Sequence, residues 1–222
     1  MVETLSMRQK TYLLLGVALL GYSASSNANI TSASWGDDND GAVVCSGWGS
    51  SGIGTSSADL TMTGVQNSAP GHMVGWVDTD STSDPTLGLY SSVDNDTSLT
   101  WTSYAVNVYM NAPFTVLANS PQVTTPGDWN PSGVTYGLSS NPQFPGDYEA
   151  SFVFASGTPI TPGGELDFQY AIHFGSSLDY SFAQEMIPMG EVSQVPEPSD
   201  LALVSGLVFG GFQLVKRLRN KV

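Results

Sequence analysis

Positive charge is almost absent from this chain. Only six of its 222 residues are Lys or Arg, against 20 Asp or Glu. All six lie near the ends, at Arg8, Lys10, Lys216, Arg217, Arg219 and Lys221, so residues 29–194 contain none. Subtracting Glu3, Glu197 and Asp200 from the 20 acids leaves 17 in this central region. Because phosphate is bound through cations, nucleic acid and anionic lipid are excluded as its partners.

Cysteine and histidine are almost as scarce. Cys45 is the single cysteine, so the chain forms no internal disulfide, and we expect it to be a small buried residue in a strand. His72 and His173 are the two histidines, and no HExxH, His-x-His or Cys/His cluster contains them, which argues against a zinc or iron site. His173 is expected on the polar face of its strand.

Catalytic motifs are also missing. The chain has no Gly-x-Ser-x-Gly elbow and no P-loop, so we predict no catalytic residues and no enzymatic activity. A pair of carboxylates facing each other across a cleft is the one alternative, because glycoside hydrolysis uses such a pair. The central region offers four glutamates for it: Glu149, Glu165, Glu185 and Glu191.

The first 28 residues have the pattern of a secretory signal peptide. Arg8 and Lys10 precede the apolar run of residues 11–20, and Ser26-Asn27-Ala28 supplies small residues for a signal peptidase. We therefore predict cleavage after Ala28 and export of the remainder. A first transmembrane helix is the alternative, but the run is short for one.

The C-terminal tail has three ordered parts. Pro196-Glu197-Pro198 with Ser199 comes first, and its prolines favour an extended, accessible segment. Residues 201–215 then form an apolar run, which predicts a helix shorter than the roughly 20 residues that span a bilayer comfortably. The basic tail 216–222 follows, with cations at Lys216, Arg217, Arg219 and Lys221. By the positive-inside rule this tail should stay cytoplasmic.

This tail resembles the PEP-CTERM sorting signal of Gram-negative bacteria, in the triplet, the single hydrophobic helix and the basic end. The resemblance implies recognition by an exosortase, a membrane-embedded cysteine-type transpeptidase, and loss of the tail near the triplet. An ordinary membrane anchor is the alternative. The predicted organisation is a signal peptide at 1–28, one domain at 29–184, a linker at 185–195 and the sorting signal at 196–222.

The central domain has an all-β composition, rich in Gly, Ser, Thr, Asn, Val and aromatics. Apolar residues alternate most clearly over Glu165–Phe174, and alternation also marks residues 148–154 and 178–183. We expect these three segments to form an antiparallel meander. Further strands are predicted at 42–47, 58–65, 72–78, 86–93, 99–110, 113–118 and 134–138. The whole predicts an antiparallel two-sheet sandwich, jelly-roll-like, with loops or edge strands over 119–147.

An acidic run, Asp37-Asp38-Asn39-Asp40-Gly41, resembles the front of a calcium loop. In an EF-hand register the twelfth position would be Gly47 instead of Glu, so the motif fails as an EF-hand. A looser calcium site using Asp37, Asp38 and Asp40 is one interpretation, and a solvated acidic turn is the other. No other cofactor is predicted.

The five tryptophans raise the question of sugar binding. Trp76 and Trp101 lie in apolar segments and are expected in the core, whereas Trp35, Trp48 and Trp129 lie among polar and turn residues, where exposure is expected. Exposed indoles lining a groove would indicate a carbohydrate-binding module.

The sequence therefore predicts an exported, exosortase-processed and non-catalytic protein. Its transient C-terminal helix holds it in the membrane before release to the cell surface or to an exopolysaccharide matrix. Signal peptidase and exosortase are the expected partners during export, and extracellular polysaccharide is a candidate partner afterwards. A carbohydrate-binding module is the alternative function, and a secreted glycan-active enzyme is the third.

Overall fold

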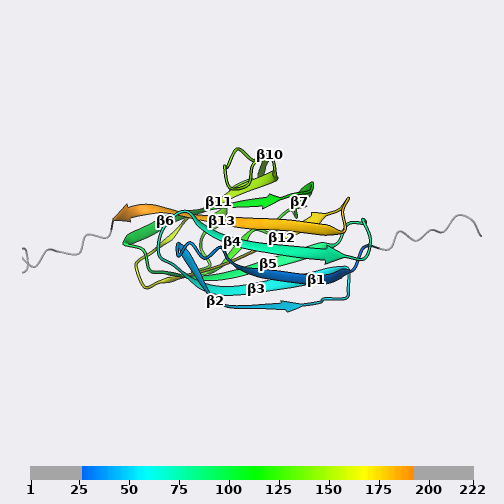
Figure 1. Ribbon diagram of the computed structural model, residues 1–222. Coiled ribbons are helices and arrows are strands. Elements are labelled where there is room, and N and C mark those ends of the chain that lie inside the picture. The colour runs from blue at the N-terminus through cyan, green and yellow to red at the C-terminus, as the bar shows by residue number, and fades with distance from the viewer. Residues whose placement is uncertain (1–26, 193–222) are drawn as a thin grey trace, which may run out of the picture.

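Two β-sheets packed face to face make up the protein (Figure 1). The computed structural model describes residues 27–192. In order across the first sheet lie β1 (Ile30–Asp37), β4 (Gly71–Thr79), β13 (Asp179–Val192), β6 (Leu99–Met110), β11 (Tyr148–Ile160) and β10 (Thr135–Leu138), with β9 (Asn130–Pro131) also paired to β11. The second sheet has the order β2 (Val43–Ser51), β3 (Ser57–Gln66), β5 (Thr86–Asn95), β12 (Glu165–Phe174) and β7 (Phe114–Val116), with β8 (Gln122–Thr125) also paired to β12. The predicted all-β sandwich is confirmed.

The core lies between the sheets and follows the alternation of the strands. In β12, Leu166, Phe168, Tyr170, Ile172 and Phe174 are all buried, while the residues between them are more exposed. From the opposite sheet, β6 and β11 contribute further aromatic rings, so that Tyr104 and Phe154 lie 5.7 Å and 5.6 Å from Phe168 between ring centroids. Burial of apolar area on this scale is the main force that holds the two layers together.

The predicted connectivity is partly wrong. The expected meander does not form, because β11 pairs with β6, β12 pairs with β5, and β13 pairs with β4 and β6. Consecutive strands here cross from one sheet to the other, and the purely antiparallel arrangement is broken by the parallel pair of β3 and β5. β1 was not predicted, whereas β8 and β9 lie in residues 119–147, where loops or edge strands were expected.

The last strand is longer than predicted. β13 runs to Val192 and has Met186 fully buried, so residues 185–192 belong to the sandwich and not to a linker. Asn107 and Val106 of β6 are the partners of Glu185 and Met186 in the register. Where the sequence predicted a spacer, Glu185 and Met186 pair with both β4 and β6, and pairing with β6 continues to Val192.

The two ends of the domain lie at opposite ends of the sandwich (Figure 1). Ala28 is buried, and the backbone N–H of Asn29 donates to Asp80 Oδ1 at 2.8 Å. The Asn29 side chain donates to Asp80 Oδ2 at 2.7 Å, which ties the start of the domain to the end of β4.

Several predictions fall outside the described residues. They are the signal peptide up to residue 26, the triplet with Ser199, the hydrophobic helix 201–215 and the basic tail 216–222. Among the residues that are described, none forms a helix able to span a membrane.

Candidate functional site

A polar cluster lies on the outward face of the first sheet. His72 of β4 and Glu185 of β13 are direct cross-strand neighbours, and Asn107 of β6 is the next residue across. Outward-facing residues of a sandwich normally contact water, yet His72 is 3% exposed and Glu185 is 6% exposed. Something therefore covers this part of the sheet.

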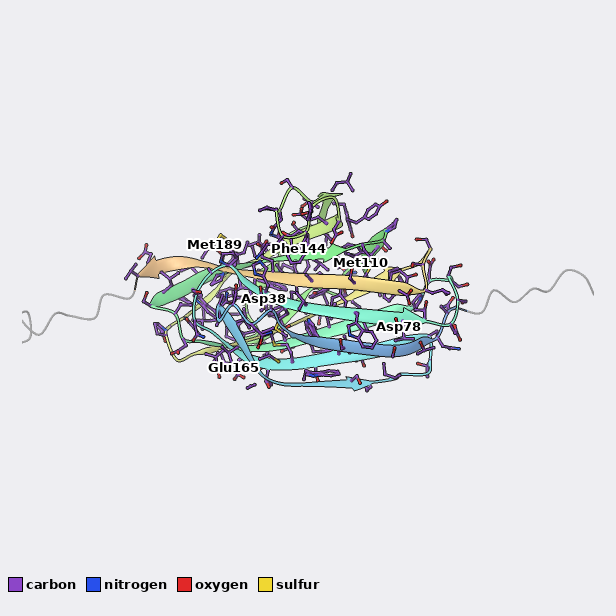
Figure 2. The ribbon with its side chains drawn as sticks, viewed as in Figure 1. Asp38, Asp78, Met110, Phe144, Glu165 and Met189 are labelled. Carbon is purple, nitrogen blue, oxygen red and sulfur yellow. The ribbon has the colours of Figure 1, made fainter. Side chains whose placement is uncertain are left out.

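The connection from β10 to β11 forms the cover. Phe144 of this connection stacks on Tyr109 with ring centroids 4.7 Å apart and meets the His72 ring edge-on at 5.8 Å. Asn141 of the same connection donates to Glu185 Oε1 at 3.2 Å. Figure 2 shows the side chains of this region, with Phe144 labelled. The connection thus shields the sheet and adds a donor to the cluster.

The Glu185 carboxylate is the centre of the hydrogen bonds. Its Oε2 accepts from Asn107 Nδ2 at 2.6 Å and from the Tyr109 hydroxyl at 2.8 Å, and its Oε1 lies 3.3 Å from His72 Nε2. Burial is the main cause that raises the pKa of Tyr109, and the negative charge of Glu185 adds to it. The Tyr109 hydroxyl therefore keeps its proton and serves as a donor.

The acidic turn between β1 and β2 approaches His72 from the other side. Asp38 Oδ1 accepts from the backbone N–H of Asp40 at 3.1 Å, and Asp40 Oδ1 accepts from the N–H of Ala42 at 2.7 Å. Each aspartate thereby has one oxygen fixed by the turn. Its other oxygen points toward the imidazole: His72 Nδ1 lies 3.4 Å from Asp38 Oδ2 and 3.8 Å from Asp40 Oδ2.

His72 Nδ1 has no hydrogen-bond partner although it is buried. It faces two carboxylates, while Nε2 faces a third. A buried carboxylate is stable only with a compensating positive charge or several donors. Glu185 has three such donors, in Asn107, Tyr109 and Asn141, whereas no Lys or Arg of residues 27–192 is available to the two aspartates.

Asp37 is separate from this cluster. Its Oδ2 accepts from the backbone N–H of Cys45 at 2.7 Å and its Oδ1 from that of Asn39 at 3.1 Å, so it closes the turn. The structure thus brings together two of the three acids of the predicted calcium site and adds His72. Sequence reasoning missed His72 and Glu185 as partners because they are 113 residues apart and meet only through the pairing of β4 with β13.

The tryptophans are placed differently from the prediction in three of five cases. Trp101 is buried and Trp48 is half exposed, as expected. Trp35 and Trp129 are buried instead of exposed, and Trp76 is 46% exposed instead of buried. The two exposed indoles belong to different sheets, Trp48 to β2 and Trp76 to β4. They do not share a groove.

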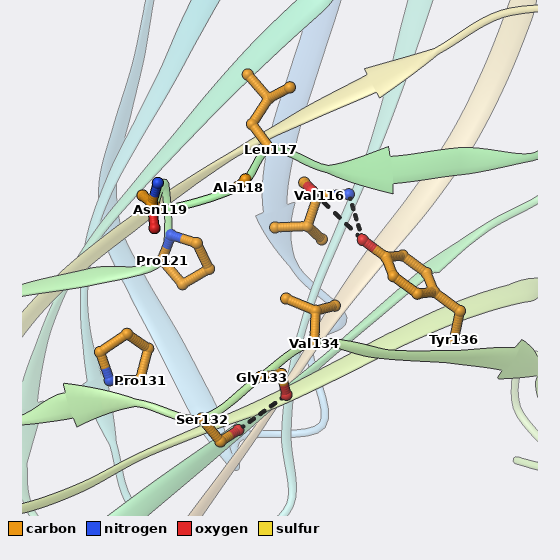
Figure 3. Close-up of a pocket in the computed structure, with 10 residues that line it drawn as sticks. All are labelled: Val116, Leu117, Ala118, Asn119, Pro121, Pro131, Ser132, Gly133, Val134 and Tyr136. Atoms are coloured by element: carbon orange, nitrogen blue, oxygen red, sulfur yellow. Dashed lines mark hydrogen bonds between the residues drawn. The ribbon is translucent and has the colours of Figure 1, made fainter.

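A separate pocket of about 480 Å³ lies where the β7–β8 and β9–β10 connections meet (Figure 3). Tyr136 forms one wall, with its hydroxyl donating to Val116 O at 3.3 Å and accepting from Val116 N at 3.1 Å. Neither an acidic side chain nor an indole is among the residues that line it, which are Val116, Leu117, Ala118, Asn119, Pro121, Pro131, Ser132, Gly133, Val134 and Tyr136. Its size falls in the range of small-molecule sites.

Cys45 and His173 belong neither to the polar cluster around His72 nor to the lining of the pocket. Cys45 is in β2 as predicted, but it is only half buried, and burial is the main cause that raises the pKa of its thiol. His173 of β12 is half buried, with Nδ1 3.0 Å from the Thr86 hydroxyl. A protonated thiol is a weak nucleophile.

No protein-family model matches the chain, and no curated protein and no solved structure matches it at the significance required.

Proposed function

We propose that the protein is exported, that an exosortase processes its C-terminal tail, and that the sandwich then serves as a non-catalytic structural protein at the cell surface or in an exopolysaccharide matrix. The jelly-roll-like connectivity and the helical tail belong to the same proposal. In this scheme the signal peptide and the sorting signal act during export, and only the sandwich acts afterwards.

One observation carries the proposal. The last described strand, β13, runs to Val192, and every Lys and Arg of the chain lies outside residues 27–192. Cations are therefore confined to the two segments with the patterns of export and sorting signals. The remaining domain has 17 acids, which favours solubility and self-repulsion over binding to anionic surfaces.

Intact mass measurement tests the processing. The chain is expressed in a Gram-negative host with an exosortase, and the forms from medium, outer surface and inner membrane are weighed. We expect a released form that starts near Asn29 and ends near the Pro196-Glu197-Pro198 triplet. Glu197→Ala should retain the tail, whereas the control Glu191→Ala, just upstream in β13, should not. A full-length chain in the cytosol or inner membrane of the exosortase host would refute the proposal.

Contact with a neutral saccharide is the second candidate function. The pocket of Figure 3 favours it, because Tyr136 is 54% exposed and no charged side chain lines the pocket. An aromatic ring with a fixed hydroxyl is a suitable surface for the apolar face of a sugar. Binding of matrix polysaccharide should weaken in Tyr136→Ala and persist in the control Tyr148→Ala, which alters an exposed tyrosine beyond the pocket lining. Equal binding by both variants would contradict a role for this pocket.

A further inference from the structure

We propose that Asp38, Asp40 and His72 bind a zinc ion or a closely similar divalent transition-metal ion. The three ligand atoms lie within 4.8 Å of one another. They come from two places in the fold, the acidic turn between β1 and β2 and strand β4, next to the edge strand β1. A metal ion here would therefore clamp the turn to the sheet.

The geometry suits three ligands of a tetrahedral ion. Ligands held about 2.0–2.1 Å from zinc in a tetrahedron lie roughly 3.4 Å apart. His72 Nδ1 is 3.4 Å from Asp38 Oδ2 and 3.8 Å from Asp40 Oδ2. The two aspartate oxygens lie within 4.8 Å of each other, so an inward movement of the exposed Asp40 side chain would complete the set. A water molecule would take the fourth position, on the side of Asp40.

The unpartnered imidazole nitrogen is the observation that points to a ligand. His72 is buried, and its Nδ1 faces the two aspartate oxygens without a hydrogen bond. A metal ion would take up the lone pair of Nδ1 in the neutral tautomer with hydrogen on Nε2. That hydrogen would be donated to Glu185 Oε1, 3.3 Å away. Metal-bound histidines characteristically donate their second nitrogen to a carboxylate in this way.

The nitrogen ligand separates this site from a calcium site. Calcium prefers six to eight oxygen ligands, whereas imidazole suits zinc and its neighbours. The first oxygen of each aspartate is already bonded to a backbone N–H, which favours binding through the second oxygen alone. One nitrogen and two single carboxylate oxygens match zinc better than calcium.

Zinc uptake by the full-length chain, purified in mild detergent without a histidine tag, tests the proposal. All versions carry Cys45→Ser, so that the one thiol does not compete for the metal. After chelator treatment, we expect dialysis against a low zinc concentration to leave one ion per chain, also with calcium and magnesium in excess. Nitrogen NMR of isotope-labelled histidine should show the metal on His72 Nδ1 and leave His173 unchanged.

Matched variants distinguish a specific zinc site from non-specific binding of zinc to surface carboxylates. Asp38→Asn/Asp40→Asn should abolish zinc retention, because it removes both carboxylate ligands. The substitutions lie in a turn, so the core should stay intact. Asp94→Asn/Asp96→Asn removes the same charge at the same spacing on exposed residues elsewhere and should retain the ion. Glu185→Gln should weaken binding by about 10- to 100-fold, as expected for the partner of a metal-bound histidine.

Three results would overturn the proposal. The first is zinc retention that both double variants preserve or lose equally. The second is displacement of zinc by calcium at comparable concentration. The third is a His72 nitrogen signal that does not respond to zinc, which would mean that His72 Nδ1 is not a ligand.

Discussion

Gln66 is a fully buried amide between the two sheets, and it shows how single polar residues join them. Its side-chain N–H groups donate to Ser68 O and Met186 O, each at 3.0 Å, and its oxygen accepts from the Tyr104 hydroxyl. Burial raises the pKa of Tyr104, so the hydroxyl stays protonated. Gln66 belongs to the second sheet and Tyr104 to the first, so the bond crosses the core.

Tyr104→Phe should lower the free energy of unfolding by about 1–3 kcal/mol, because it leaves the buried oxygen of Gln66 without a donor. Chemical denaturation of the two proteins measures the difference. The control Tyr148→Phe alters a ring that is 40% exposed, and its effect should be small. Equal effects of the two substitutions would contradict the importance of the buried bond.

Asp80 gives a prediction about pH. The backbone and side-chain N–H groups of Asn29 donate to its carboxylate and lower its pKa below the ordinary value of 3.8. A depressed pKa stabilises the fold above the ordinary value, and that contribution is lost as the pH falls through the depressed one.

The melting temperature of Asp80→Asn should therefore lie below that of the parent at neutral pH and approach it in acid. Melting curves from neutral pH to below pH 3.8 provide the measurement. The same comparison with Asp96→Asn serves as control, because that carboxylate has no hydrogen bond of this kind within the described residues. A constant gap at every pH would argue against the Asn29 contact.

At the scale of elements, the close fit of β9 against β11 depends on a glycine. Trp129, just before β9, is buried over Gly157 of β11, and its indole N–H donates to Thr158 O at 2.7 Å. A Cβ atom at Gly157 would overlap the indole ring.

Gly157→Ala should therefore destabilise the fold by about 1–3 kcal/mol through overpacking. The control is Gly133→Ala, because a Cβ atom there meets nothing within 4 Å. Differential scanning calorimetry reports the effect. A Gly157→Ala protein as stable as the Gly133→Ala protein would contradict this packing.

The strands that the sequence predicts well are those with regular alternation. Residues 165–174 were predicted with the observed bounds, because their apolar residues pack into the core at every second position. Residues 99–110 were also predicted with the observed bounds, although they are apolar on both faces. β1 was missed because its eight residues are mostly small and polar. The end of β13 was missed because Pro188 and Gly190 resemble a spacer.

The candidate site was less predictable than the strands. Asp38 and Asp40 stand out locally, but the acidic run alone indicated Asp37 equally well. His72 and Glu185 lie on strands that pair in the sheet but are far apart in the chain. Local patterns carry no information about such pairing, so Glu185 was predicted to lie in a linker. The burial of the polar cluster by Phe144 was not predicted for the same reason.

At the scale of the whole molecule, 17 carboxyl groups in residues 27–192 face no Lys or Arg. Their mutual repulsion should be screened by salt, with a screening length that falls from about 30 Å at 0.01 M to about 3 Å at 1 M. The melting temperature should therefore rise with sodium chloride over that range. A neutral osmolyte of matched osmolality serves as control, and a melting temperature independent of salt would contradict net repulsion.

The length of β13 fixes how close the domain stays to any anchor behind it. Three residues separate Val192 from Pro196, so the four Cα–Cα steps between them span at most about 14 Å. An enzyme that cuts at the triplet would therefore work close to the folded sandwich, which restricts its access to the cleavage site. If the proposed C-terminal helix anchors the protein, the end of the sandwich that carries Val192 lies near the lipid surface and the end that carries Asn29 lies farthest from it. Inserting a short flexible spacer after Val192 would lengthen this tether, and faster cleavage is the result expected if crowding limits the reaction.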